Sequence, residues 1–177
     1  MEYNQVKIKA NQLYLTSTTE GDRRFYLLVL LALETGARVS DLLKFSLSSH
    51  FKEENGVPYV TYLNQKSKKQ QVLKVSKETY DKVKDVIGSS TSVMGNCLFY
   101  NDKKKTIMSR ITANRKCTKV FGFNFHNLRK IAGKNIASQK GVIYASTFLG
   151  HSRVSTTDLY LGISTEQFKK DMLDVVI

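Results

Sequence analysis

The strongest constraint on the fold is an apolar segment at residues 25–33, FYLLVLLAL. A helix of this sequence is apolar on every side, so other parts of the chain have to bury it. We predict a helix over residues 22–35 that ends at Gly36, because glycine readily adopts the left-handed backbone of a helix C-cap. Nine apolar residues, bounded here by Arg24 and Glu34, are too few to cross a bilayer.

The rest of the chain predicts shorter helices and one β-hairpin. A short helix should follow from Ser40, which can cap it. Residues 57–65 and 71–75 are rich in β-branched and aromatic side chains and flank the turn KSKKQ, which indicates two antiparallel strands. Ser76 is a candidate N-cap for the next helix. A short buried segment is expected at 98–101, and further helices at about 106–119, 125–139, 142–148, 155–161 and 164–176. The predicted fold class is mainly α with a small antiparallel β-sheet (α+β).

The length and charge of the chain indicate one domain with a polyanionic partner. The 177 residues suit a single domain with its own core. Lys and Arg total 28 against 15 Asp and Glu, a formal net charge of +13. Nucleic acid is the commonest partner of such an excess, although a merely basic soluble protein has the same composition.

Metal, cofactor and membrane chemistry are not indicated. Cys97 and Cys117 are the two cysteines, and they do not have metal-ligand spacing. We expect them to be reduced thiols, and we predict neither a metal nor a cofactor. The N-terminus MEYNQVKIKANQ lacks the apolar region of a signal peptide. A cytoplasmic or nucleoid-associated protein with no membrane partner is therefore expected.

The first candidate for chemistry is Arg38, at the junction of two predicted helices. A cation near a helix N-terminus is unfavourable unless an anion is also bound there. A phosphate would suit the guanidinium and the helix N-terminus together. Asp41 lies three residues on and could orient the guanidinium. An Arg–Asp pair at the surface is the alternative.

Other candidates lie in the last third of the chain. His126 and Arg129 are spaced i, i+3 on a predicted helix, so both should project from one face. His151 follows Leu149-Gly150, a predicted helix break, and Tyr160 comes nine residues later. Each has an ordinary alternative: a solvated pair for the first two, and packing for the tyrosine.

Three of these segments together resemble the signature boxes of the tyrosine recombinases, the phage integrase family. That family's pattern reads roughly T-G-x-R-x-x-E/D-L-L, then H-x-L-R, then L-G-H-x-x-x-x-T-x-x-Y. Here the matching segments are TGARVSDLL (35–43), HNLR (126–129) and LGHSRVSTTDLY (149–160), within a resemblance that covers residues 12 to 164.

The resemblance implies a catalytic-domain fold and a role for each matched residue. The two phosphate-clamping arginines fall on Arg38 and Arg129. The second-box histidine falls on His126, the His/Trp position on His151, and the nucleophile on Tyr160. Two positions depart from the family pattern without touching these groups: Asn127 replaces a common acidic residue, and Lys74 replaces a proline.

The family's hairpin lysine has two candidates. Aligning Lys74-Val75-Ser76 with the family's Pro-Leu-Ser places this lysine at Lys66, eight residues earlier. Lys68 is the alternative if the hairpin register differs. The solvated tip of a basic turn is the ordinary explanation for both lysines.

The implied activity is site-specific DNA recombination or integration. Tyr160 would attack a phosphodiester to give a 3′-phosphotyrosyl intermediate and a free 5′-OH, and strand exchange and religation would follow without ATP or metal. The implied partners are a specific double-stranded DNA site, further copies of the chain as a dimer or tetramer, and accessory DNA-bending proteins. Basic residues that would contact the DNA backbone, or form a solvated face, are Lys103, Lys104, Lys105, Arg110, Arg115, Lys116 and Lys119.

Two expectations concern the ends of the chain. Members of the family usually carry an N-terminal core-binding domain, so residues 1–177 are expected to be a catalytic domain excised from a longer protein, with a reduced protein as the alternative. The tail, residues 165–177, is expected to form a helix whose apolar stripe either packs on a neighbouring protomer or joins its own core.

Two rival functions share parts of this evidence. A type IB topoisomerase uses the same tyrosine chemistry but relaxes supercoils without exchanging partners, and LGHSRVSTTDLY favours the recombinase. A DNA-binding module with vestigial catalytic residues is the rival from another class. The presence of the whole residue set argues against it.

Overall fold

The computed structural model describes residues 1–88, 97–101 and 105–150. His151, Tyr160 and the helices expected at 155–161 and 164–176 lie outside the described residues. In chain order the elements are α1 (Tyr3–Thr16), α2 (Glu20–Thr35), α3 (Val39–Leu42), α4 (Leu47–His50), β1 (Phe51–Glu54), β2 (Val57–Leu63), β3 (Gln70–Lys74), α5 (Lys77–Gly88), β4 (Tyr100–Asn101), β5 (Thr106–Ile107), α6 (Arg110–Phe121), α7 (His126–Lys140) and α8 (Val142–Phe148). The predicted α+β class is confirmed.

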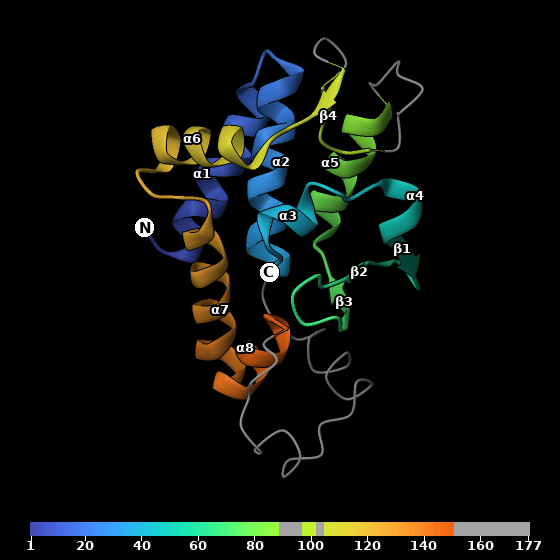
Figure 1. Cartoon of the computed structure of the whole chain (residues 1–177), viewed down its shortest axis with the longest axis vertical. Helices are drawn as coiled ribbons and strands as arrows, with labels where there is room; N and C mark the ends of the chain where they lie inside the picture. The colour runs from blue at the N-terminus through green and yellow to red at the C-terminus, as the bar shows by residue number, and fades with distance from the viewer. Residues whose placement is uncertain (89–96, 102–104, 151–177) are drawn as a thin grey trace.

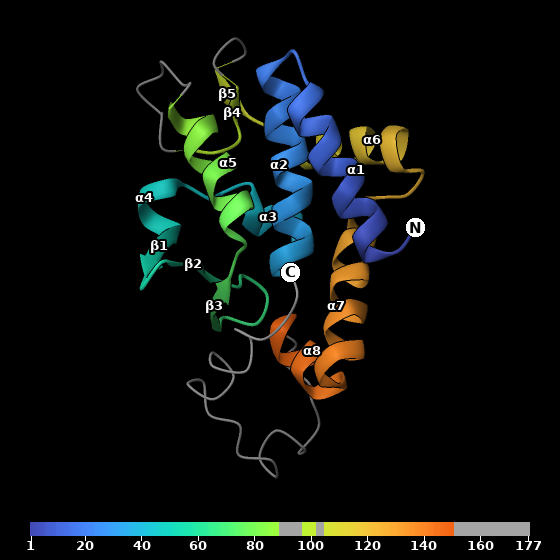
Figure 2. The same ribbon diagram turned by 180° about the vertical axis from the view of Figure 1, so that it is seen from behind.

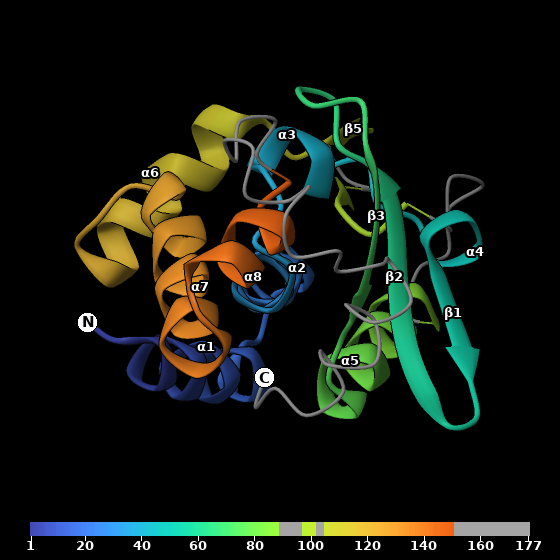
Figure 3. The same cartoon turned by 90° about the horizontal axis from the view of Figure 1, so that it is seen from below.

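Helix α2 is the centre of the fold, as its apolar sequence predicts. Every residue from Arg24 to Thr35 is buried, and the helix ends at Gly36, whose φ of 58° is left-handed. Seen from below (Figure 3), α2 lies end-on in the middle, with α1, α6 and α7 on one side and the β1–β3 sheet with α5 on the other. The reverse view in Figure 2 shows α1 beside α2.

The charged residues expected to bound this apolar run are themselves buried. Arg24 is 2% exposed, and its Nε donates to Glu20 Oε1 at 2.8 Å. Its Nη1 donates to the carbonyl of Leu98 at 2.5 Å. A buried guanidinium needs such partners, and here they attach the 97–101 segment to α2.

The sheet contains the predicted hairpin and one further strand. Strands β1, β2 and β3 are antiparallel in that order, and Val60 pairs with Phe51 on one side and Leu73 on the other. All three of these side chains are buried and form the core face of the sheet. The unpredicted strand β1 is joined to β2 by Asn55-Gly56, with φ values of 52° and 76°. Asn-Gly is the strongest sequence signal for such a turn.

Several boundaries differ from prediction for local reasons. Helix α1 was not predicted. The helix expected at 106–119 begins only at Arg110, because residues 106–107 pair with β4 and Ser109 Oγ accepts from the Thr112 N–H at 3.1 Å. Ser40 lies inside α3 and does not cap it. Ser76 does cap α5, since its Oγ accepts from the Thr79 N–H at 3.2 Å.

No helix in the described part of the chain is long and apolar enough to cross a membrane.

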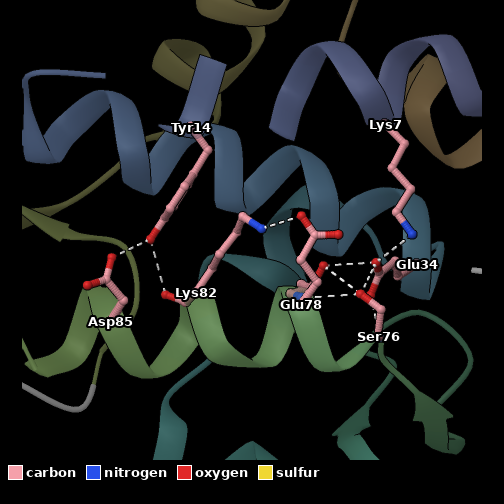
Figure 4. Close-up of polar contacts among 8 residues, drawn as sticks. Lys7, Tyr14, Glu34, Ser76, Glu78, Lys82 and Asp85 are labelled. Carbon is pink, nitrogen blue, oxygen red and sulfur yellow. Dashed lines mark hydrogen bonds and ion pairs between the residues drawn. The ribbon is translucent and has the colours of Figure 1, made fainter. Parts of the chain in front are cut away.

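A buried carboxylate joins α1, α2 and α5 (Figure 4). Glu34 on α2 is 2% exposed. It accepts hydrogen bonds from the Ser76 N–H at 2.8 Å, the Ser76 hydroxyl at 2.7 Å and the Thr79 hydroxyl at 2.8 Å. Lys7 Nζ on α1 lies 3.2 Å from Glu34 Oε1. A buried carboxylate is tolerated only with such partners, so these contacts fix the relative positions of the three helices.

We expect Glu34→Ala to lower the free energy of unfolding by about 3–5 kcal/mol, because it leaves Lys7 and the α5 N-terminus without their buried acceptor. Urea denaturation at pH 7 measures this. The control is Asp81→Ala, which removes the exposed partner of Lys84 on α5 and should remain near wild type. Equal losses for the two variants would contradict the structural role assigned to Glu34.

Candidate active site

One pocket brings together three of the predicted catalytic residues. It has a volume of about 560 Å³ and is lined by Arg38, His126 and Arg129, together with Arg110 and Arg115 of α6. No Asp or Glu lines this pocket among the residues that the structure describes. A concave site with several guanidiniums, and with no carboxylate among its described lining residues to neutralise them, is suited to binding an anion.

Arg129 is held by two backbone carbonyls. It lies on α7 and is 5% exposed. Its Nη1 donates to the carbonyl of Gly36 and its Nη2 to the carbonyl of Leu149, the latter at 2.5 Å. Burial, and then the charge of Arg38, lowers the pKa of Arg129 to about 10. The guanidinium therefore stays charged at pH 7 and joins the ends of α2 and α8.

Two glycines allow the end of α8 to lie close to α2, α7 and Arg129. Gly36 has a φ of +58°, and a Cβ there would lie 2.5 Å from Phe148 Cε1 and 2.9 Å from Leu149 Cδ2. A Cβ on Gly133 of α7 would lie 2.8 Å from Leu149 Cδ1. Because both positions lack a side chain, Phe148 and Leu149 pack directly against α2 and α7, and the Leu149 carbonyl reaches Arg129.

Arg38 is oriented by a residue other than the one expected. It occupies the N-cap position of α3, with an extended backbone at φ −71° and ψ 148°. The i, i+3 geometry of a helix therefore does not apply to Arg38 and Asp41. Arg38 Nη1 instead donates to Oδ1 of Asn64 at 2.7 Å.

Asp41 is buried beside the arginines without hydrogen-bonding them. It is 3% exposed, and neither carboxylate oxygen has a well-formed hydrogen bond within the described residues. Burial raises the pKa of Asp41, against the opposing effects of Arg38 and of the backbone N–H of Gln65. Asp41, which the sequence suggests as a residue that could orient the Arg38 guanidinium, therefore acts on Arg38 through its charge and not through a hydrogen bond.

His126 is the first residue of α7 and lies at the pocket with Arg129, as the i, i+3 spacing predicts. Its pKa is lowered from the usual 6.5, first by loss of solvation and then by the charges of Lys130, Arg129 and Arg38. The imidazole is therefore mostly neutral at pH 7 and can accept a proton.

The structure leaves the choice of hairpin lysine open. Lys66 and Lys68 lie in the loop between β2 and β3, and both are exposed. Lys68 has a left-handed φ of 56°. Neither lysine lines the pocket that contains the arginines. The proposed roles of both lysines, and those of His151 and Tyr160 outside the described residues, stay predictions.

Of the basic residues expected to meet DNA, Lys103 and Lys104 lie outside the described residues. Arg110 and Arg115 line the pocket. Lys116 instead pairs with Asp22 on α2 at 2.6 Å, and so attaches α6 to the core.

Asn64, the partner of Arg38, was not predicted from the sequence, because an asparagine after a strand usually indicates only a turn.

The sequence matches the phage integrase family over residues 7–167. The chain belongs to the phage integrase family. A search of curated proteins finds no match.

Solved structures of recombinases have the same fold. XerH site-specific recombinase bound to difH substrate, before cleavage, matches 96% of this chain with a TM-score of 0.70 and 14% identity. The lambda integrase catalytic core matches 85% of the chain with a TM-score of 0.60 and 22% identity, and 91% of that core is covered. A lambda integrase dimer bound to a COC′ core site has a TM-score of 0.60, with 20% identity over 89% of the chain and 45% of the integrase. The chain spans about half of XerH, 51% of its length.

Substituting Gly36 should disturb the arrangement around Arg129. We expect Gly36→Ala to lower the free energy of unfolding by about 2–4 kcal/mol, from the left-handed backbone and from overpacking against Phe148 and Leu149. Gly122→Ala is the matched control, because Gly122 also has a positive φ, +80°, but nothing lies within 4 Å of its Cβ position. Gly122→Ala should cost about 1–2 kcal/mol. Urea denaturation measures both variants, and a Gly36→Ala loss no larger than that of Gly122→Ala would exclude the packing contribution.

Proposed function

We propose that this chain is the catalytic domain of a tyrosine-type site-specific recombinase that breaks and rejoins double-stranded DNA. The observation that carries the proposal is the pocket lined by Arg38, His126 and Arg129, with no Asp or Glu among its described lining residues, in a member of the phage integrase family. The signature tyrosine of that family falls on Tyr160.

The arginines would bind the phosphate to be cut. A phosphodiester resists attack because its non-bridging oxygens are anionic, and guanidiniums stabilise the further charge of the transition state. Arg129 is rigid, since two of its N–H groups are fixed by the carbonyls of Gly36 and Leu149. Within the described residues Arg38 donates a side-chain hydrogen bond through Nη1 alone, so we propose that its other donors bind the phosphate. His151 would add a hydrogen bond to the same oxygens.

Proton transfers would accompany each step. Tyr160 is a poor nucleophile at neutral pH, because a free tyrosine has a pKa of about 10. His126, with its lowered pKa, would accept the phenolic proton. The Tyr160 oxygen forms a bond to phosphorus while the bond to the 5′-oxygen breaks, and Lys66, or Lys68 as the alternative, would give that oxygen its proton.

The intermediate conserves the bond energy of the phosphodiester. The products of cleavage are a 3′-phosphotyrosyl linkage and a free 5′-OH. When a 5′-OH from a partner strand attacks that linkage, the steps run in reverse and the recombinant strand is sealed. The scheme therefore uses neither ATP nor a metal.

Binding to a duplex site as a dimer or tetramer completes the proposal. The formal charge of +13 and the guanidiniums of Arg110 and Arg115 beside the pocket support backbone contacts. Lambda integrase has been solved as a dimer on a core site, and XerH has been solved on its difH substrate. Integration of a mobile or viral genome is one role that this chemistry would serve, and excision, inversion and dimer resolution use the same steps.

A nicked duplex that releases its short 5′-OH strand after cleavage tests the nucleophile. We expect a protein–DNA adduct that resists SDS, and we expect Tyr160→Phe to form none, because it lacks the attacking oxygen. Tyr144→Phe is the control and should form the adduct. An adduct from Tyr160→Phe at the wild-type rate would rule out Tyr160 as the nucleophile.

The lowered pKa of His126 predicts the acid limb of the cleavage rate. A general base must be neutral, and the pKa of His126 lies below 6.5. The midpoint of the acid limb should therefore lie below pH 6.5, the usual pKa of a histidine. Single-turnover adduct formation between pH 5 and 8 measures this. His126→Asn should lower the plateau and abolish the acid limb; an acid limb that is unchanged in the variant would assign it to another group.

A further inference from the structure

The residue that contacts Arg38 also organises the lysine-bearing loop. Asn64 directly follows β2 and is fully buried, with 0% exposure. Its Oδ1 accepts from Arg38 Nη1 at 2.7 Å, from the Lys66 N–H at 3.2 Å and from the Ser67 N–H at 3.3 Å. Three donors around one atom establish that this atom is the amide oxygen. One side-chain atom therefore joins the first-box arginine to the β2–β3 loop.

The backbone of Asn64 holds the same loop. Its N–H donates to the carbonyl of Lys69 at 2.9 Å, and its carbonyl accepts from the Lys68 N–H at 2.8 Å. All three lysines of the loop thus belong to a turn built around Asn64.

Asn64 also packs closely against the end of the described chain. Gly150 has a φ of +60°, and a Cβ there would lie 2.6 Å from Asn64 Nδ2 and 3.0 Å from Gln71 Nε2. Asn64 is therefore in direct reach of Arg38, of the lysine loop and of the segment that precedes His151 in the sequence.

We propose that Asn64 is a positioning residue, whose amide oxygen holds the Arg38 guanidinium and the β2–β3 loop in one arrangement for DNA cleavage. Its effect on the reaction rests on the function proposed above. Asp41 makes no hydrogen bond with Arg38, so Asn64 is the residue that fixes the direction of this guanidinium among the described residues. A charged donor that is fixed before the phosphate binds loses less freedom on binding.

The first test needs no DNA. Asn64→Ala removes the acceptor, Asn64→Asp keeps an oxygen in the same place, and Gln65→Ala alters an exposed side chain in the same loop as the control. Hydrogen exchange with water, followed by NMR, should be at least tenfold faster at the Lys66 and Ser67 amides in Asn64→Ala and near wild type in the other two. Unchanged exchange in a folded Asn64→Ala protein would overturn the proposal.

The second test separates positioning from binding. With the nicked duplex at saturating protein, Asn64→Ala should form the adduct about 10-fold to 100-fold more slowly, the range that corresponds to one hydrogen bond to a charged group. Its Kd for the same DNA should change by less than about threefold, since the phosphate contacts remain. Asn64→Asp should recover part of the rate, and Gln65→Ala should keep all of it.

The two readouts keep the two proposals distinguishable. A rate of Asn64→Ala equal to wild type, or a loss fully explained by weaker binding, would exclude Asn64 as a positioning residue. If the wild-type protein formed no adduct, the proposed function would fail, while the exchange experiment would still decide whether Asn64 holds the loop.

Discussion

The site depends on the buried guanidinium of Arg129. Its two hydrogen bonds to the carbonyls of Gly36 and Leu149 join segments that are more than a hundred residues apart in sequence. A buried charge with unsatisfied donors is costly, so the ends of α2 and α8 are held where their carbonyls meet it. Arg129 therefore holds two distant segments together and is also a candidate phosphate ligand. Glycines are needed near it because they leave room for the Leu149 carbonyl to reach its guanidinium.

The charges around Arg129 are arranged to favour an anion. Arg38 and Arg129 both approach the pocket, and Arg38 lowers the pKa of Arg129. Asp41 partly offsets this repulsion from a buried position, since its charge raises the pKa of Arg129. A bound phosphate would relieve what remains of the repulsion, so the arrangement is at its most favourable when the pocket is occupied.

Sequence patterns predicted the features that depend on local chemistry. The structure contains five features that the sequence predicted, because each follows from periodicity or capping. They are the apolar α2, its glycine C-cap, the β2–β3 hairpin, the Ser76 cap and the i, i+3 pair His126 and Arg129. The signature segments added the identity of the family.

The features that were missed depend on contacts between distant segments. The partner of Arg38 is Asn64, 26 residues away, and no local spacing indicates it. The buried residues of α1, Tyr3, Val6, Ala10 and Tyr14, share one face of the helix and pack against α2. The exposed Ile8 and Leu15 lie among or next to them in the sequence and obscure this stripe. Strand β1 carries the exposed pattern of an edge strand, so only the Asn-Gly turn could have indicated it.

The contact of Lys7 with Glu34 has a consequence for the extent of the folded unit. The match to the family begins at residue 7, yet Tyr3 and Val6 before it are already buried. Lys9 Nζ also donates to the Val120 carbonyl at 2.8 Å. The first turns of α1 therefore belong to the core rather than to a linker. Any segment joined before residue 3 in a larger protein would meet a rigid helix, and its freedom to reorient would begin only on the N-terminal side of that helix.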